Sequence, residues 1–328
     1  MIISKTPYRI SLFGGGTDYP EWYCKYGGAI ISGTINKYIY ISVRDLPNFF
    51  EHKYRISYSK IEEVKNLNQI KHIPIKKMLK YFELENNGLE IHYDGDLPSK
   101  SGMGSSSSFV VGLFKALYEK KYTKFITKKN LSLKSIYLEQ KVLNETVGIQ
   151  DQIAASHGGF SFIKINTKGN YKIKNFDIKI SNKIEKNLFL VYTNVSRVAN
   201  DIAKTYVHKL RKNKMLHDLQ QITEEVNRNF CDNNIDKIDN YLNYSWEIKK
   251  KLSKLVSNSS IDNLYQYGLK IGATGGKLLG AGGGGFFLFF VPKDNQKKFL
   301  KLMKKKKTVI PIKFENSGST IIFNSELN

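Results

Sequence analysis

The chain has 328 residues, and its 52 Lys and Arg against 29 Asp and Glu give a formal net charge of +23. Only six of the basic residues are arginine, the side chain that binds base edges and phosphates bidentately, so the charge favours a lysine-rich solvated surface over a nucleic-acid partner. The hydrophobic content of 41% suffices for a packed core, and two cysteines cannot form a disulfide framework. No apolar run approaches the roughly 20 residues that span a membrane, so we expect a cytoplasmic protein without membrane contact.

Apolar alternation and helical periodicity predict a mixed first half of the chain. We predict strands at residues 39–43, 89–93, 160–165 and 171–178, and helices at residues 109–118 and 132–147. In the second of these helices, one apolar face carries Leu133, Ile136, Tyr137, Leu143 and Val147. Turn residues at 167–170 predict a hairpin between the last two strands.

The second half of the chain changes character. Residues 203–267 are predicted to be mainly helical, with breaks near residues 232–234 and 257–260. A glycine-rich loop follows, then a strand at 286–291, a lysine-rich helix at 296–306, and strands at 309–314 and 319–323. A βαββ ending packed on helices predicts an α+β fold. The change in composition near residue 180 predicts two domains, residues 1–180 and 181–328.

The strongest chemical signal is a glycine- and serine-rich segment, residues 97–108, ahead of an apolar helix. Small residues bring the backbone close to a ligand, and the N–H groups and dipole at a helix start favour an anion. The segment therefore predicts a phosphate site formed by Gly102, Met103, Gly104, Ser105, Ser106 and Ser107. The alternative is a serine that only caps the helix. The segment lacks the Gly-Lys-Ser/Thr ending of a Walker A loop.

Two carboxylates could complete such a site. Asp151 lies in the segment Gly-Ile-Gln-Asp-Gln, after a predicted helix that carries Glu139. Phosphoryl transfer needs a carboxylate that accepts a hydroxyl proton, and Mg²⁺ needs hard oxygen ligands, so Asp151 and Glu139 are candidates for these two tasks. The alternatives are a turn-capping aspartate and an exposed helix carboxylate beside Lys141.

A third signal stands at the N-terminus, where Arg9 leads an apolar strand into a glycine turn, with Asp18 just beyond it. A buried arginine needs an anion, and an active-site carboxylate or phosphate would supply one; the alternative is a surface arginine at a strand end. Glycines cluster at residues 14–16, 102–104, 158–159 and 272–285, the last cluster enclosing Lys277. Four such clusters predict several loops that converge on one site.

Together these segments resemble the GHMP kinase superfamily. The motifs that carry the resemblance are residues 9–19, 98–108 and 277–285, which occur in the family's order across nearly the whole chain. The resemblance implies an N-terminal domain of a kind also seen in a ribosomal protein and a ferredoxin-like C-terminal domain with added helices. It also implies an ATP-dependent kinase that uses Mg²⁺.

The resemblance also assigns roles to residues. It implies that Asp151 is the catalytic base, that Arg9 lies beside the reacting hydroxyl, and that Ser106 and Glu139 bind the metal. The substrate residues that it implies are Gly15, Gly16, Thr17, Asp18 and Gly283. Galactokinases have a glutamate where this chain has Gly15, and its absence suits a substrate with an extended or anionic tail. We consider Arg197 and Lys277 the candidates for binding that anion.

Within the superfamily the motifs are most similar to the kinases of D-glycero-D-manno-heptose 7-phosphate. That similarity implies phosphorylation of the anomeric hydroxyl to the 1,7-bisphosphate, on the way to a GDP-activated heptose for surface polysaccharide. Two alternatives stay open: a sugar 1-kinase acting on fucose or an N-acetylhexosamine, and an RNA-binding protein. The partners that we expect are ATP and a small sugar phosphate, with a homodimer as one possible assembly.

Overall fold

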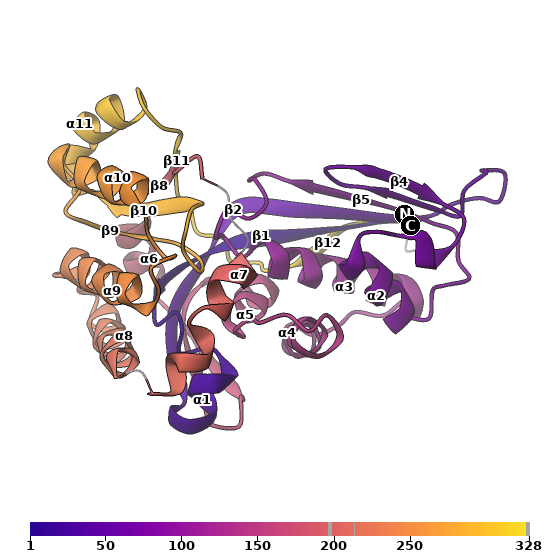
Figure 1. Cartoon of the computed structure of the whole chain (residues 1–328), viewed down its shortest axis with the longest axis horizontal. Helices are drawn as coiled ribbons and strands as arrows, with labels where there is room; N and C mark the ends of the chain where they lie inside the picture. The colour runs from indigo at the N-terminus through magenta and orange to yellow at the C-terminus, as the bar shows by residue number, and fades with distance from the viewer. Residues whose placement is uncertain (196–198, 213, 326–328) are drawn as a thin grey trace.

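The computed structural model describes residues 1–195, 199–212 and 214–325 and arranges them around two β-sheets (Figure 1). The larger sheet has eight strands in the order β12-β1-β2-β5-β3-β4, with β6 on β2 and β7 on β6. Its strands are β1 (Ile2–Phe13), β2 (Gly28–Asp45), β3 (Tyr54–Ser57), β4 (Ile61–Val64), β5 (Leu89–Gly95), β6 (Phe160–Ile165), β7 (Tyr171–Asn175) and β12 (Thr320–Asn324).

The long strand β2 organises this sheet. Its first part pairs with β6, its second part pairs with β5, and β1 runs antiparallel along its other edge. Figure 1 shows the helices α2 to α5 along one face of the sheet. The helical segments of this half are α1 (Pro20–Tyr26), η1 (Leu67–Gln69), α2 (Ile73–Tyr81), α3 (Ser105–Tyr122), α4 (Lys128–Tyr137), the π-helical turn η2 (Leu138–Val142) and α5 (Gln150–His157).

Helix α3 forms the centre of the first core. Its middle is apolar except for Lys115, as expected of a helix that is covered on most sides. It packs on β1 and β2 on one side and on α4 and α5 on the other. Because β1 and α3 are held together in this way, the beginning of α3 has a fixed place beside the middle of β1.

The smaller sheet is antiparallel with the order β11-β8-β10-β9. Numbered along the chain, its strands lie in the order 4-1-3-2, which is the ferredoxin-like arrangement. The elements are α6 (Ile178–Glu185), β8 (Leu188–Tyr192), α7 (Ala199–Lys204), η3 (Val207–Lys212), α8 (Met215–Cys231), α9 (Ile238–Leu252), α10 (Ser259–Lys270), β9 (Gly275–Leu278), β10 (Phe286–Phe290), α11 (Lys293–Met303) and β11 (Val309–Pro311).

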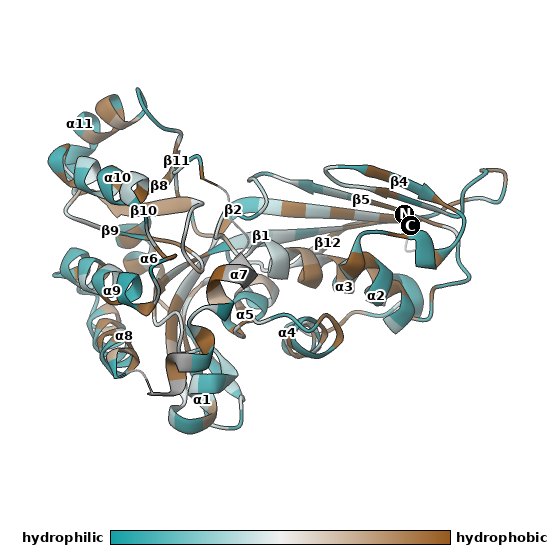
Figure 2. Ribbon diagram, viewed as in Figure 1, coloured by the Kyte–Doolittle hydropathy of each residue, from teal (hydrophilic) through white to brown (hydrophobic). Residues whose placement is uncertain are grey.

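The Phe-Phe-Leu-Phe-Phe strand β10 is buried along its whole length: Phe287 and Phe289 belong to a second core, and the alternate residues Phe286, Leu288 and Phe290 belong to the first. Helices α8 to α11 each bury one apolar face, and Figure 2 shows polar surface, in teal, on the rest of these helices. The α+β class is therefore confirmed. No helix of the described residues is long and apolar enough to cross a membrane.

The expected βαββ ending needs one correction. Strand β12 does not join the smaller sheet but pairs with β1 in the larger one. The segment between β11 and β12 already contacts the larger sheet. Phe314 forms a β-bridge with Ile35, and its ring stacks on that of Phe160 at 4.5 Å between centroids. The division into residues 1–180 and 181–328 stays a prediction, and the last strand lies in the sheet of the first part.

The predicted helix at residues 132–147 is also different. It begins at Lys128, becomes π-helical at Leu138 and ends at Val142. Leu133 and Tyr137 are 40% and 51% exposed, while the neighbouring face with Leu131 and Ser135 is buried. The small serine side chains allow α4 to pack closely on α5 and α3, which outweighs the apolar count of the other face.

Smaller differences concern the ends of elements. The strand predicted to reach residue 178 ends at Asn175, because Asp177 caps α6 by accepting a hydrogen bond from the Lys179 N–H. The lysine-rich helix begins three residues earlier than predicted, at Lys293, directly after Pro292. The strand predicted at 309–314 is only Val309–Pro311.

The contact between β2 and the Phe160–Phe314 stack yields a test of the fold. A Cβ at Gly33 would lie 2.3 Å from the Phe314 ring and 3.1 Å from Phe160. We expect Gly33→Ala to lower the free energy of unfolding by about 1–3 kcal/mol, as overpacking does, in urea unfolding followed by circular dichroism. Adding Phe314→Leu should recover part of the loss because a smaller side chain replaces the ring. Equal stability of Gly33→Ala and the wild type would contradict this packing.

Candidate active site

A cavity of about 480 Å³ lies among elements of both sheets. It is lined by the end of β1 and its glycine turn, the start of α3, the start of α5, and residues of α9 and β9. Segments from both ends of the chain meet here, and most of the residues singled out in the sequence lie around this one cavity.

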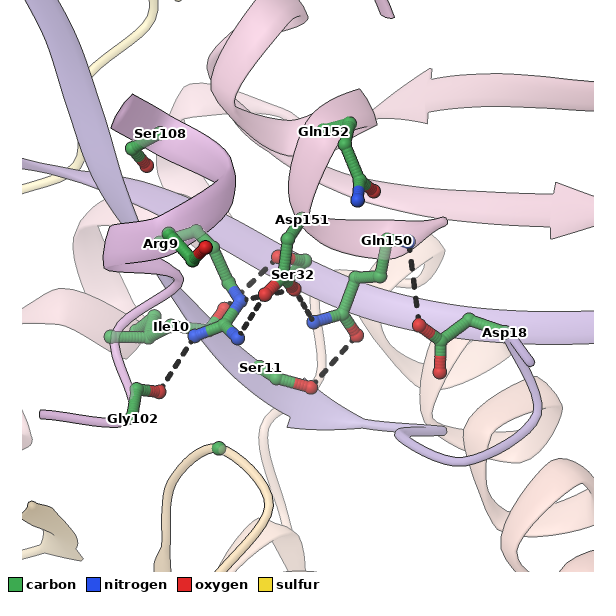
Figure 3. A network of polar contacts seen from close by, with 12 residues as sticks. Arg9, Ile10, Ser11, Asp18, Ser32, Gly102, Ser108, Gln150, Asp151 and Gln152 are labelled. Atoms are coloured by element: carbon green, nitrogen blue, oxygen red, sulfur yellow. Dashed lines mark hydrogen bonds and ion pairs between the residues drawn. The ribbon is translucent and has the colours of Figure 1, made fainter. Parts of the chain in front are cut away.

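An ion pair between Arg9 and Asp151 lies at its centre (Figure 3). The Arg9 Nε and Nη2 groups donate to Asp151 Oδ1 and Oδ2, each at 2.6 Å, and Nη1 donates to the carbonyl of Gly102 at 2.8 Å. The arginine side chain is 6% exposed, whereas that of Asp151 is 26% exposed. The planar guanidinium thus fixes the orientation of a carboxylate that remains open to the cavity.

The local sequence around Asp151 supports this orientation. Asp151 lies in the first turn of α5, and the side chain of Gln150 donates to Asp151 Oδ1 at 3.2 Å. Ser11 donates to Gln150 Oε1 at 2.9 Å. Because Ser11 is two residues after Arg9 on β1, both side chains lie on the same face of the strand. One strand face therefore holds both Asp151 and its neighbour.

Asp18 occupies a buried position beside this pair. Its two carboxylate oxygens accept hydrogen bonds from the N–H groups of Gly16, at 3.0 Å, and Gln150, at 3.3 Å. Burial, and to a smaller extent the charge of Asp151, raises the pKa of Asp18 to about 6. A Cβ at Gly148 would lie 1.8 Å from Asp18 Oδ2, so only glycine leaves room for the carboxylate there.

The predicted phosphate segment forms the start of α3. Gly102 and Gly104 have φ of +77° and +72°, and Gly104 takes the cap position with no side-chain cap hydrogen bond. Ser105, Ser106 and Ser107 occupy the first turn, whose N–H groups have no partner within the helix, and they line the cavity. Met103 is fully buried, and its carbonyl accepts a hydrogen bond from the Arg9 N–H at 3.1 Å. Together these features place a helix start with free N–H donors beside Arg9, a position that suits an anion.

The glycine-rich loop after β9 packs against this segment. A Cβ at Gly280 would lie 2.5 Å from Gly102 Cα, and the N–H of Phe286 donates to the Ser101 carbonyl at 3.1 Å. Three of the four glycine clusters thus meet near the cavity. The prediction for the fourth was wrong: Gly158 packs against residues 316–318, away from the cavity lining.

Glu139 is fully buried in the π-helical turn, not on an exposed helix face. Gln152 donates to its Oε2, and the Ser106 hydroxyl lies 3.5 Å from its Oε1. Within the described part of the chain no cation pairs with it. Burial raises the pKa of Glu139 to about 8, although hydrogen bonds from Ser107 and Gln152 oppose the shift. A buried carboxylate without a cation is a position that suits a metal ion.

Two lysines of the second half line the cavity. Lys277 on β9 is 6% exposed and donates to the Leu12 carbonyl at 2.8 Å. Lys249 on α9 donates to the carbonyls of Leu278, at 2.7 Å, and Gly280, at 2.6 Å. Burial and nearby positive charges lower the pKa of both, that of Lys277 to about 8. Lys249 was missed in the sequence because nothing local separates it from the other 45 lysines.

Only some of the other predicted substrate residues line the cavity. Gly15 and Gly16 line the cavity. Thr17 does not; its hydroxyl donates to the Gly14 carbonyl at 2.8 Å and closes the turn. Gly283 also lies off the lining, where its N–H donates to Val256 at 2.8 Å. Arg197 lies outside the described residues.

An aromatic end of the cavity was not predicted. Beyond the start of α3, the cavity is lined by His72, Pro74, Tyr93 and Phe109. The rings of Tyr93 and Phe109 meet edge to face at 5.3 Å, and the ring of His72 lies 5.2 Å from that of Phe109. These residues come from three separate elements, so only the folded chain reveals their proximity.

Comparison with known proteins identifies the family. A model of the GHMP kinase N-terminal domain matches residues 73–159, and a model of the GHMP kinase C-terminal region matches residues 226–306. The chain is 30% identical, over 86% of each chain, to a D-glycero-alpha-D-manno-heptose 7-phosphate kinase of Campylobacter jejuni. It is 23% identical to a bifunctional fucokinase/GDP-fucose pyrophosphorylase of Arabidopsis thaliana, over 84% of this chain and 28% of that one.

The fold comparison agrees. A crystal structure of a D-glycero-D-manno-heptose 1-phosphate kinase from Bacteroides thetaiotaomicron superposes with a TM-score of 0.79, at 22% identity over 99% of both chains. The chain therefore belongs to the GHMP kinase family and has its fold, and it is a kinase. The family that the sequence motifs indicated is confirmed.

The buried Glu139 yields a test of pH dependence. Its pKa of about 8, against an ordinary 4.5, means that the folded chain keeps a proton that the unfolded chain has released. The contribution to stability is therefore present below about pH 4.5 and is lost as the pH rises through 8. We expect Glu139→Gln, without ligands, to exceed the wild type by roughly 1–4 kcal/mol in free energy of unfolding at pH 8.5 and to match it near pH 4.5. Urea unfolding at both pH values measures this, and parallel pH profiles would contradict it.

Proposed function

We propose that this GHMP kinase transfers the γ-phosphoryl group of ATP to the anomeric hydroxyl of D-glycero-D-manno-heptose 7-phosphate, giving the 1,7-bisphosphate. The observation that carries the proposal is the Asp151 carboxylate, held by Arg9 at 2.6 Å on both oxygens, open to a cavity that also receives the start of α3. A base, a phosphate site and a sugar-sized space then adjoin one another. The heptose 7-phosphate kinase relative at 30% identity supports the choice of substrate.

In this proposal the nucleotide binds along the part of the cavity that the N-terminal half of the chain forms. Its phosphates would lie against the N–H groups of residues 102–107, where the helix dipole and the unpaired donors favour anions. The adenine ring of ATP would lie at the aromatic end of the cavity, between His72, Tyr93 and Phe109, which offers apolar surface beyond the phosphates.

The residues at Glu139 fit a magnesium ion. Glu139 is a buried carboxylate whose partners are only amide and hydroxyl groups, and Ser106 adds a hydroxyl oxygen beside it. Bound there, Mg²⁺ would neutralise charge on the nucleotide phosphates. The fit is a property of the donor set, because a carboxylate enclosed without a cation is costly unless one binds.

Asp151 and Arg9 then divide the chemistry. Asp151 accepts the proton of the anomeric hydroxyl or orients it, and the remaining work is positioning and electrostatic stabilisation. Three of the five guanidinium N–H donors of Arg9 are occupied by Asp151 and Gly102, which leaves two for the moving phosphoryl group.

The glycine turn beyond Arg9 would face the sugar. Asp18 is positioned by backbone N–H groups and can accept hydrogen bonds from sugar hydroxyls. Gly15 lines the cavity without a side chain, which leaves space for the tail of a substrate longer than a hexose. We propose that the product serves a GDP-activated heptose for surface polysaccharide.

The relatives' names leave the position of phosphorylation to experiment, since one names heptose 7-phosphate and the other heptose 1-phosphate. The purified enzyme should be incubated with MgATP and heptose 7-phosphate, fucose or an N-acetylhexosamine, and the products followed by ³¹P and ¹H NMR. We expect a new phosphate on C1 of the heptose and turnover at least about 100-fold slower on the other sugars. Preferred turnover of fucose or an N-acetylhexosamine would replace the proposed substrate. Membership of a kinase family leaves the RNA-binding alternative without support.

The role of Asp151 is tested by Asp151→Asn. We expect kcat to fall by about 10²–10⁴-fold, because the amide cannot accept the proton, while the KM for ATP changes little. The matched control is Asp294→Asn, an exposed aspartate in the first turn of α11, which should leave kcat unchanged. Turnover of Asp151→Asn within threefold of the wild type would remove the assignment.

A further inference from the structure

We propose that Ser245, Lys249 and Lys277 form a second anion subsite, which binds the distal phosphate of the sugar substrate. This inference rests on the proposed function, and it places recognition of the substrate's phosphate on the C-terminal half of the fold. It concerns a site separate from the phosphate-binding start of α3.

Helix α9 presents two of the three groups. Ser245 and Lys249 are four residues apart, so they lie one above the other on the same face, and both line the cavity. The Lys249 ammonium donates to the carbonyls of Leu278 and Gly280. An ammonium has three donors, so these two bonds orient the group and leave one donor for a ligand.

The Ser245 hydroxyl is a buried group without a partner. The residue is 2% exposed, and its Oγ makes no hydrogen bond with any part of the described chain. Buried hydroxyls are almost always paired, because an unpaired one costs free energy. A hydroxyl that lines a cavity beside an ammonium group is satisfied when an anion binds.

Lys277 completes the set from the neighbouring strand. Its side chain is buried, donates to Leu12 and leaves two donors. Positive charges accumulate here: Arg9 lowers the pKa of Lys277, and Lys277 and Arg9 both lower that of Lys249. Asp151 is already paired with Arg9, and neither lysine has a carboxylate partner within the described residues. A phosphate dianion would relieve this repulsion.

The position favours the sugar's phosphate over those of ATP. Helix α3 begins beside Arg9 and runs toward the start of β1, where Gly112 accepts a hydrogen bond from Ser4. Lys277 donates to the carbonyl of Leu12. Leu12 is three residues, or about 10 Å, from Arg9 along β1, toward the glycine turn and away from the direction in which α3 runs. Lys249 lies nearer the start of α3, through Gly280, so the subsite extends from the reaction centre toward the sugar side.

Ser245→Ala is the decisive variant. The hydroxyl has no hydrogen-bond partner among the described residues, so its removal breaks no hydrogen bond seen in the fold, and we expect the loss to appear in ligand binding. We expect the KM for heptose 7-phosphate to rise by about 10-fold, as for a lost hydrogen bond to a charged group, with the KM for ATP and kcat within about twofold. Lys249→Met should raise the same KM further, and Lys251→Met, an exposed lysine on the same helix, should not change it.

Direct binding separates the sources of the phosphate. Calorimetry with inorganic phosphate, in the presence of saturating MgADP, should show one site in the wild type and at least about 10-fold weaker binding in Ser245→Ala. A rise in the KM for ATP instead would assign these residues to the nucleotide, and unchanged constants in Ser245→Ala would also overturn the subsite. If the wild type prefers an unphosphorylated sugar but Ser245→Ala still weakens phosphate binding, the proposed function fails and the anion subsite stands.

Discussion

Arg9 and Asp151 are 142 residues apart in the chain, and their two hydrogen bonds join β1 to α5 at the centre of the cavity. Because the guanidinium also donates to the carbonyl of Gly102, it fixes the beginning of α3 relative to the Asp151 carboxylate. Much of the site follows from this arrangement. Gly104 has a φ of +72°, and a Cβ there would lie 3.1 Å from Arg9 Cγ and 3.3 Å from the guanidinium carbon. The side chain of Gln150 links Ser11 to Asp151 and so helps to orient the carboxylate.

The net charge of +23 has two different meanings in this protein. Most lysines are on the surface, where they reflect the composition of the chain and not a binding site. At the cavity wall, by contrast, Arg9 is paired with a carboxylate, whereas Lys249 and Lys277 have only carbonyl partners. Behind the wall, the buried Glu139 has only neutral donors. In the proposed function, ligand phosphates would complement the lysines and a cation would complement Glu139.

The sequence could predict those parts of the site that short motifs carry. Such motifs surround Arg9, Asp151 and the start of α3. Their glycines and serines allow a ligand to approach the backbone closely, so the pattern itself indicates a site. Lys249 and Ser245 carry no such mark, because α9 is an ordinary amphipathic, lysine-rich helix until β9 places it beside the cavity. The return of β12 to β1 was equally hidden, since local alternation predicts a strand but not its partner. On α4, close packing of small serines decided which face is buried, and counting apolar residues chose the wrong one.

Burial shifts the charge state of several groups around the cavity, and these groups come from both halves of the chain. Burial raises the pKa of Asp18 and Glu139 and lowers that of Lys277, so each group is shifted toward its neutral form in the absence of ligands. A ligand that requires the charged form must therefore offset the free energy of charging a buried group. In the proposed function, a cation at Glu139 and an anion at Lys277 would each favour the charged form of the group that binds it. Under the proposed function, a substrate that carries phosphate would meet this requirement and an uncharged one would not.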